Sequence, residues 1–161
     1  MLNIWKIAAS EDQILSFVSS VVVPEPATRS KFLTSKRILV STTHGTIWSV
    51  QILKDSQGNK YLDKPIAVFR NTDLSTIWDF AIVESSLTGK QAESHYDVIL
   101  ASDSGEVRHV AIEFLQVKSE TVLIKFVGQS ALRLSIDQSD QTILTVGGNH
   151  TVKVAKLSYD E

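Results

Sequence analysis

The last quarter of the chain, residues 132–157, constrains the fold more than any other stretch. It reads LRLSIDQSDQTILTVGGNHTVKVAKL, which is three short apolar runs separated by polar turns at 138–140 and 148–150. Short runs rich in Val, Ile, Leu and Thr and bounded by Gly, Asn, Asp and Ser are typical of antiparallel strands joined by tight turns. This stretch therefore predicts an antiparallel β-meander.

Earlier parts of the chain repeat the same pattern. Further strands are predicted at 2–7, 14–18, 19–23, 38–41, 46–52, 65–69, 76–83, 97–102, 106–114 and 121–127. The polar stretches 24–36, 54–64 and 84–95 are expected to be long loops, with a short helix in 84–95 as an alternative. No segment carries a helical apolar stripe of about ten residues or more, so the chain is predicted to be all-β.

The strands recur at nearly constant intervals. When the strands that follow the tight turns are aligned, Leu2, Ile47, Val107 and Val152 come into register, at intervals of 45, 60 and 45 residues. A period of about 40–45 residues with four strands per period is typical of a propeller blade. The longer middle interval is accounted for by the polar stretches 54–64 and 84–95.

The residues of these units resemble WD40 repeats. Residues 136–147 (IDQSDQTILTVG) and 148–154 (GNHTVKV) resemble the inner strand, turn and following strands of such a repeat. Residues 99–107 (ILASDSGEV) and 2–7 (LNIWKI) resemble the corresponding strands of other units. The resemblance implies a propeller of four-stranded blades that binds proteins.

The Trp-Asp pair that names the WD40 family is absent from all four units. The corresponding positions hold Trp5-Lys6, Val50-Gln51, Val110-Ala111 and Ala155-Lys156, and Trp78-Asp79 lies on a different strand. The chain thus resembles a divergent member, in which packing between blades is expected to provide most of the stability. Trp5, Trp48 and Trp78 are interpreted as part of that packing.

The blade count is too small for a closed ring. The units are assigned to residues 1–18, 19–70, 76–127 and 131–157, which is about three and a half blades within a single fragment spanning 1–161. Propellers normally close with about 4–8 blades. We therefore expect the C-terminal part of a propeller, whose remaining blades lie in another chain or were lost by truncation.

Successive turns of a meander alternate between its two ends, which sorts the loops into two faces. The turns at 42–45, 70–75, 103–105, 128–131 and 148–150 are expected on one face, and the three long loops on the other. The WD40 resemblance implies that the first face binds protein segments. The candidate protein-binding residues there are His44, Arg70, Asp73, Asp103, Gln129 and His150. A purely structural interpretation is also open, since Asn, Asp and His tolerate the left-handed backbone of tight turns.

Composition and motifs argue against several classes of function. The chain has no cysteine and a net charge of −2, and no apolar run approaches the roughly 20 residues that span a bilayer. It contains no phosphate-binding glycine loop, nucleophile elbow or His/Cys metal spacing. No catalytic group, cofactor or metal is therefore predicted. The expected function is a non-catalytic protein–protein interaction scaffold in a larger cytoplasmic or nuclear complex, with no membrane association.

Two alternatives remain open at this stage. A nucleic-acid-contacting subunit could use Arg29, Lys31, Lys36 and Arg37 in the first polar stretch, although the basic residues are scattered. A propeller enzyme could use titratable residues near the starts of inner strands, and Asp73, Asp79 and Arg133 are the candidates.

Overall fold

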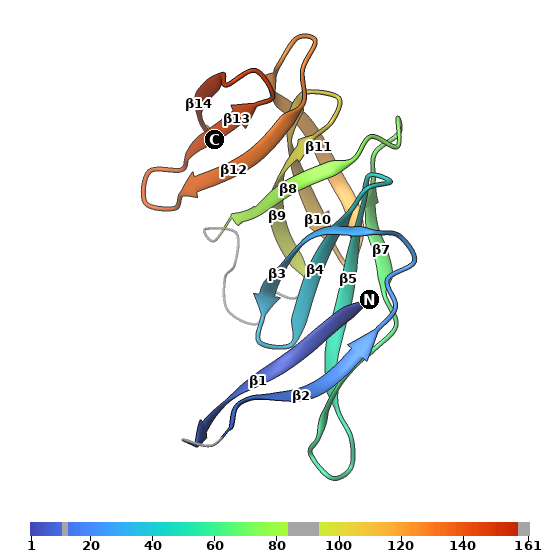
Figure 1. The fold of residues 1–161 in the computed structure, drawn as a ribbon. Coiled ribbons are helices and arrows are strands. Elements are labelled where there is room, and N and C mark those ends of the chain that lie inside the picture. Colours follow the sequence, from blue (N-terminus) through green and yellow to red (C-terminus); the bar gives the residue numbers. More distant parts are fainter. Residues whose placement is uncertain (11–12, 84–93, 158–161) are drawn as a thin grey trace.

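The computed structural model describes residues 1–10, 13–83 and 94–157, and it leaves the side chains of 6–16 undescribed (Figure 1). Over these residues the chain forms β-strands and no helix, which confirms the all-β prediction. The strands form several antiparallel sheets, and none of them closes on itself. The described residues contain no helix long and apolar enough to cross a bilayer.

Four sheets follow one another along the chain. The first is the hairpin of β1 (Leu2–Ser10) and β2 (Gln13–Val21). The second contains β3 (Ala27–Thr34), β4 (Arg37–Thr42), β5 (Thr46–Lys54), β6 (Lys60–Leu62) and β7 (Ile66–Arg70). The third contains β8 (Ile77–Val83), β9 (His95–Ser102), β10 (Glu106–Glu113) and β11 (Gln116–Lys125). The fourth contains β12 (Ala131–Asp137), β13 (Thr142–Gly147) and β14 (Val152–Lys156), so the meander predicted at 132–157 is present.

Several predicted boundaries are wrong in detail. Residues 14–23 were divided into two strands, but β2 is one strand that pairs with β1. The polar stretch 24–36 contains β3, which pairs only with β4 within the described part of the chain and buries only Leu33, so its sequence lacks the apolar run of a core strand. The stretch 54–64 contains the short strand β6. Most of the third predicted loop, residues 84–93, lies outside the described residues, and β9 begins at His95.

The sheets pack face to face in chain order, with one apolar layer between each pair. The layer between the second and third sheets contains Leu39, Ile47, Phe69, Phe80, Tyr96, Val98 and Leu100. The layer between the third and fourth sheets contains Ile99, Ala101, Val107, Phe126 and Ile143. The continuous run VILA at 98–101 therefore sends alternate side chains into two different layers, as expected for a strand covered on both faces.

The first strand of each of the last three sheets lies next to the first strand of its neighbour. In the second sheet the order is β3-β4-β5 with β7 on the other side of β5; in the third it is β8-β9-β10-β11, and in the fourth β12-β13-β14. β8 contacts both β3 and β12, and Figure 1 shows these strands side by side. We call β3, β8 and β12 the inner strands.

Candidate functional site

The tight turns of neighbouring sheets are joined by hydrogen bonds into one continuous row. The Thr76 hydroxyl donates to the Thr43 carbonyl (2.8 Å), and the Asp103 amide donates to the Thr76 carbonyl (2.8 Å). Further along, the Gly148 amide donates to the Ser130 carbonyl (3.0 Å). We call residues 42–45, 70–76, 103–105, 128–130 and 147–150 the turn row. All six candidate binding residues belong to it.

Asp103 joins the third and fourth sheets within the turn row. Its carboxylate accepts hydrogen bonds from the Ser130 hydroxyl (2.7 Å) and from the Trp78 indole Nε1 (3.0 Å). These two bonds, that of Ser130 first, hold the pKa of Asp103 below its ordinary value. Asp103 therefore has a structural role in the turn row, in addition to any role in binding.

Gln129 and Asp73 also stabilise the turns in which they lie. The Gln129 Oε1 accepts from the Asn149 amide at 2.9 Å, which links two turns of the row. The Asp73 carboxylate accepts from the Ser75 amide at 3.0 Å, and this bond is the main reason that the pKa of Asp73 is lowered. His44 and His150 are exposed, and His150 adopts the left-handed conformation (φ 59°) that the structural interpretation expects.

Arg70 is paired with Glu25, a residue that the sequence analysis missed. The Arg70 Nη2 lies 3.2 Å from the Glu25 Oε1, and that carboxylate also accepts from the hydroxyls of Thr42 and Thr46. Burial raises the pKa of Glu25, but the two hydroxyls and the charge of Arg70 outweigh burial and lower it overall. The stretch 24–36 was expected to be a loop on the face opposite the turn row, but β3 occupies most of it. Glu25 precedes the first residue of β3, where the chain runs beside the turn 42–45, and so it lies at the turn row. Its position between Pro24 and Pro26 was the available signal.

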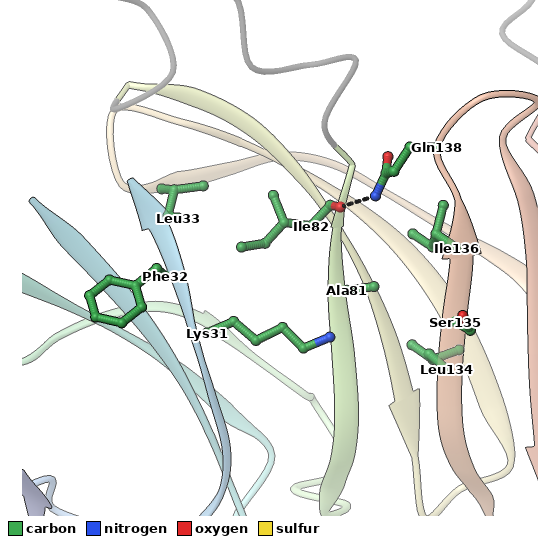
Figure 2. Close-up of a pocket in the computed structure, with 9 residues that line it drawn as sticks. All are labelled: Lys31, Phe32, Leu33, Ala81, Ile82, Leu134, Ser135, Ile136 and Gln138. Atoms are coloured by element: carbon green, nitrogen blue, oxygen red, sulfur yellow. Dashed lines mark hydrogen bonds between the residues drawn. The ribbon is translucent and has the colours of Figure 1, made fainter. Parts of the chain in front are cut away.

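A hollow of about 620 Å³ lies between the inner strands (Figure 2). It is lined by Lys31, Phe32, Leu33, Ala81, Ile82, Leu134, Ser135, Ile136 and Gln138. Figure 2 shows the Lys31 side chain extending from β3 toward β8, and the Gln138 Nε2 donates to the Ile82 carbonyl at 3.0 Å. Six of the nine lining residues are apolar, but Lys31, Ser135 and Gln138 add polar surface, so this hollow is of mixed character and contains one ammonium group.

Asp79 connects three sheets at the inner strands. It is 2% exposed, and its carboxylate accepts from Arg29 Nε on β3 (3.0 Å) and from the Leu134 amide on β12 (3.2 Å). The other two residues of the enzyme alternative are engaged elsewhere. Asp73 bonds to its own turn, and the Arg133 Nη1 donates to the Leu132 carbonyl. Within the described residues, no group of three His, Asp or Glu residues could hold a metal ion.

The basic residues of the nucleic-acid alternative are partly occupied by contacts within the fold. Arg29 pairs with Asp79, and the Arg37 Nη1 donates to the Ser49 hydroxyl at 2.9 Å. The Lys31 Nζ lies 5.7 Å from the centre of the Phe80 ring. Three of the four side chains therefore have contacts within the fold, and the four are divided between β3, the β3–β4 turn and β4, so they do not form a free basic stripe.

The outer face of the fourth sheet is uncovered. Leu144, Val152 and Val154 are 43%, 57% and 65% exposed. Leu144 is paired directly with Val154, and Val146 with Val152, so these side chains share one face. The opposite face carries Ile143 and packs on the third sheet. Among the described residues β14 pairs only with β13, so its other edge is open in that part of the chain.

All three tryptophans were expected to pack between sheets, but the structure shows this arrangement only for Trp48. The Trp78 indole Nε1 donates a hydrogen bond to Asp103 of the turn row, and Trp48 packs against the layer between the first and second sheets. Trp5 is 54% exposed and contacts Phe17 edge to face, with ring centres 5.4 Å apart.

Comparison with known proteins assigns no family to this arrangement. No protein-family model matches the chain, and no curated protein matches it.

Proposed function

We propose that the chain is a partial propeller of about three and a half WD40-like blades that acts as a non-catalytic scaffold for protein–protein interaction. The repeated meander order, the face-to-face packing of the four sheets and the adjacency of the three inner strands support this proposal. The absence of the Trp-Asp pair makes it a divergent member of that family. In this proposal the chain would belong to a complex of the cytoplasm or the nucleus.

The observation that carries the proposal is the uncovered face of the fourth sheet. Exposed apolar side chains along β13 and β14 lie beside an open strand edge. An exposed apolar face with an unpaired edge associates with other β structure unless it is covered. The proposed partner is a protein chain whose β structure covers Leu144, Val152 and Val154, pairs with β14 and continues the propeller.

The turn row is proposed as a second contact surface. Its backbone is held by hydrogen bonds between sheets, so exposed side chains such as His44, His150 and Arg70 would be presented at little cost in conformational entropy. Protein segments that bind there would gain most of their affinity from a few such anchors.

Sedimentation velocity over a range of concentrations tests the proposal. With no partner present, copies of the chain are expected to self-associate through the fourth sheet. The double variant Val152→Lys/Val154→Lys should sediment as a monomer, because two charges would have to be buried at the contact. Val127→Lys, at a residue 87% exposed outside the fourth sheet, is the matched control and should behave as wild type. A wild-type chain that stays monomeric at all concentrations would contradict the proposal.

A further inference from the structure

Three adjoining hollows form a groove that begins between the hairpin β1–β2 and the second sheet and ends on the second sheet alone. Their volumes are about 290, 700 and 430 Å³. The first two share Ile4, Trp5 and Phe32, and the last two share Ser35, Ile52, Lys54 and Lys60. We call this continuous depression the hairpin groove. It is distinct from the fourth sheet and from the turn row.

Three large aromatic side chains stand in the hairpin groove with more than half of their surface exposed. Trp5 is 54% exposed, Phe17 55% and Phe32 62%. Their neighbours in the groove include the aliphatic side chains of Ile4 and Ile52. Scattered single apolar residues are ordinary on a protein surface, but three exposed aromatic rings in one concavity indicate an interaction site.

The charged residues that line the hairpin groove are all of one sign. They are Lys31, Lys36, Lys54 and Lys60. Among the described residues that line the three hollows there is no Asp or Glu. The nearby Asp55 does not line the groove, and its carboxylate accepts from the amides of Gln57 and Asn59 within its own turn. The ammonium groups of Lys54 and Lys60 at the rim are therefore available to negatively charged groups of a ligand, whereas that of Lys31 extends toward β8 and lies 5.7 Å from the centre of the Phe80 ring.

We propose that the hairpin groove binds an extended peptide segment in which aromatic or branched apolar side chains alternate with Asp or Glu. The apolar side chains would pack between Trp5, Phe17 and Phe32, and the carboxylates would pair with Lys54 and Lys60 at the rim. This partner goes beyond the proposed function, because it binds at a different place and by a different chemistry from the β structure that covers the fourth sheet.

The shape and lining of the groove favour a peptide over a single-stranded nucleic acid. Single strands are bound through successive bases stacked on open aromatic faces. Trp5 and Phe17 instead meet edge to face, with an interplanar angle of 73°. The aliphatic floor also matches an apolar side chain, as in grooves that take the anchors of extended peptides.

Fluorescence anisotropy of the full chain tests the proposal with three labelled ligands. The first is an extended peptide of alternating Glu and Phe, the second has Lys in place of Glu, and the third is an oligodeoxythymidine. The Glu/Phe peptide is expected to bind and the Lys/Phe peptide is not. Phe32→Ser should weaken binding about tenfold. Lys54→Glu/Lys60→Glu should weaken it by a similar factor at low salt, and by less as salt screens the rim charges.

Matched controls separate the groove from general surface effects. Phe114→Ser removes an aromatic ring that is 68% exposed in the turn between β10 and β11, and Lys64→Glu reverses an exposed charge that does not line the groove. Both variants should bind as wild type. A measurement on the wild-type protein tests the proposal even if a variant fails to fold. The NMR signals of the Trp5 indole should shift when the Glu/Phe peptide is added, and those of Trp78 should not.

Each outcome decides the proposal. Failure of the Glu/Phe peptide to bind, or binding that is insensitive to both groove variants, would overturn it. Tighter binding of the oligodeoxythymidine that is lost in the same variants would also overturn it, by assigning the groove to nucleic acid. None of these results changes the sedimentation expected for Val152→Lys/Val154→Lys, so the two proposals can fail separately.

Discussion

Replacing Asp79 tests whether the inner strands are held together by side-chain bonds between sheets. In Asp79→Ala the Leu134 amide loses its carboxylate acceptor, and Arg29 loses its partner. A buried hydrogen bond to a charged group is worth about 1.5–3 kcal/mol. The Arg29 side chain is 42% exposed, so its pair with Asp79 is screened and adds about 1 kcal/mol or less. The expected loss in free energy of unfolding is therefore about 3 kcal/mol.

Urea unfolding followed by circular dichroism, together with thermal melting, measures this loss. For a chain of this size about 3 kcal/mol corresponds to a fall in Tm of roughly 6–12 °C. Arg29→Ala and the double variant complete a cycle in which the coupling between the two residues should be about 1 kcal/mol or less. Asp140→Ala is the control, because Asp140 is exposed and its carboxylate accepts within its own turn, from the Thr142 amide. A loss of less than about 1 kcal/mol in Asp79→Ala would refute the reasoning.

Three further predictions concern backbone, charge and burial. Gly105→Ala should destabilise the fold by at least about 3 kcal/mol in urea unfolding, because φ is 80° and an added Cβ would lie 2.3 and 2.4 Å from the carbonyl oxygens of Gln129 and Phe126. The control is Gly58→Ala, where φ is 85° but an added Cβ would meet no atom within 4 Å, and it should destabilise the fold by only about 1 kcal/mol. The lowered pKa of Asp103 means that its stabilisation is present above its ordinary value of 3.8 and is lost as the pH falls below it. Unfolding across that range should thus show a smaller pH dependence in Asp103→Asn, and an equal dependence would contradict this. Burial raises the pKa of Tyr96 to about 12, and its hydroxyl has no hydrogen-bond partner among the described residues. Tyr96→Phe should therefore retain wild-type stability within about 1 kcal/mol and remove one tyrosine that titrates late in ultraviolet absorbance.

Strands could be predicted from the sequence where neighbouring sheets cover one or both of their faces, because such strands carry a regular apolar pattern. The run 98–101 and the meander 132–157 carry apolar residues at every position or at alternate ones, and both form strands. β3 was missed because it lies at the inner edge of its sheet and carries Arg29 and Lys31 toward neighbouring sheets and the hollow. A strand of that kind has no apolar period in its sequence.

The candidate site was predictable only in its placement. Turn spacing brought the six candidate residues to one row, since successive meander turns alternate between two ends. Their hydrogen bonds were not predictable, because those of Asp103 and Gln129 join residues 20 to 27 positions apart. For the same reason Glu25 was not selected as a site residue, and Asp79 was considered only as a candidate for the enzyme alternative. Their partners are distant in the sequence, and contacts of that kind cannot be inferred from the spacing of residues along the chain.

Hydrogen exchange along β14 tests the central claim most directly. We expect the amides on the open edge of Val152–Lys156 to exchange rapidly in dilute protein. Those amides should become protected as concentration rises and another chain covers the fourth sheet, while β9 should be protected throughout. Protection of both edges of β14 in the monomer would contradict the claim, because it would mean that the chain seals this edge with its own strands.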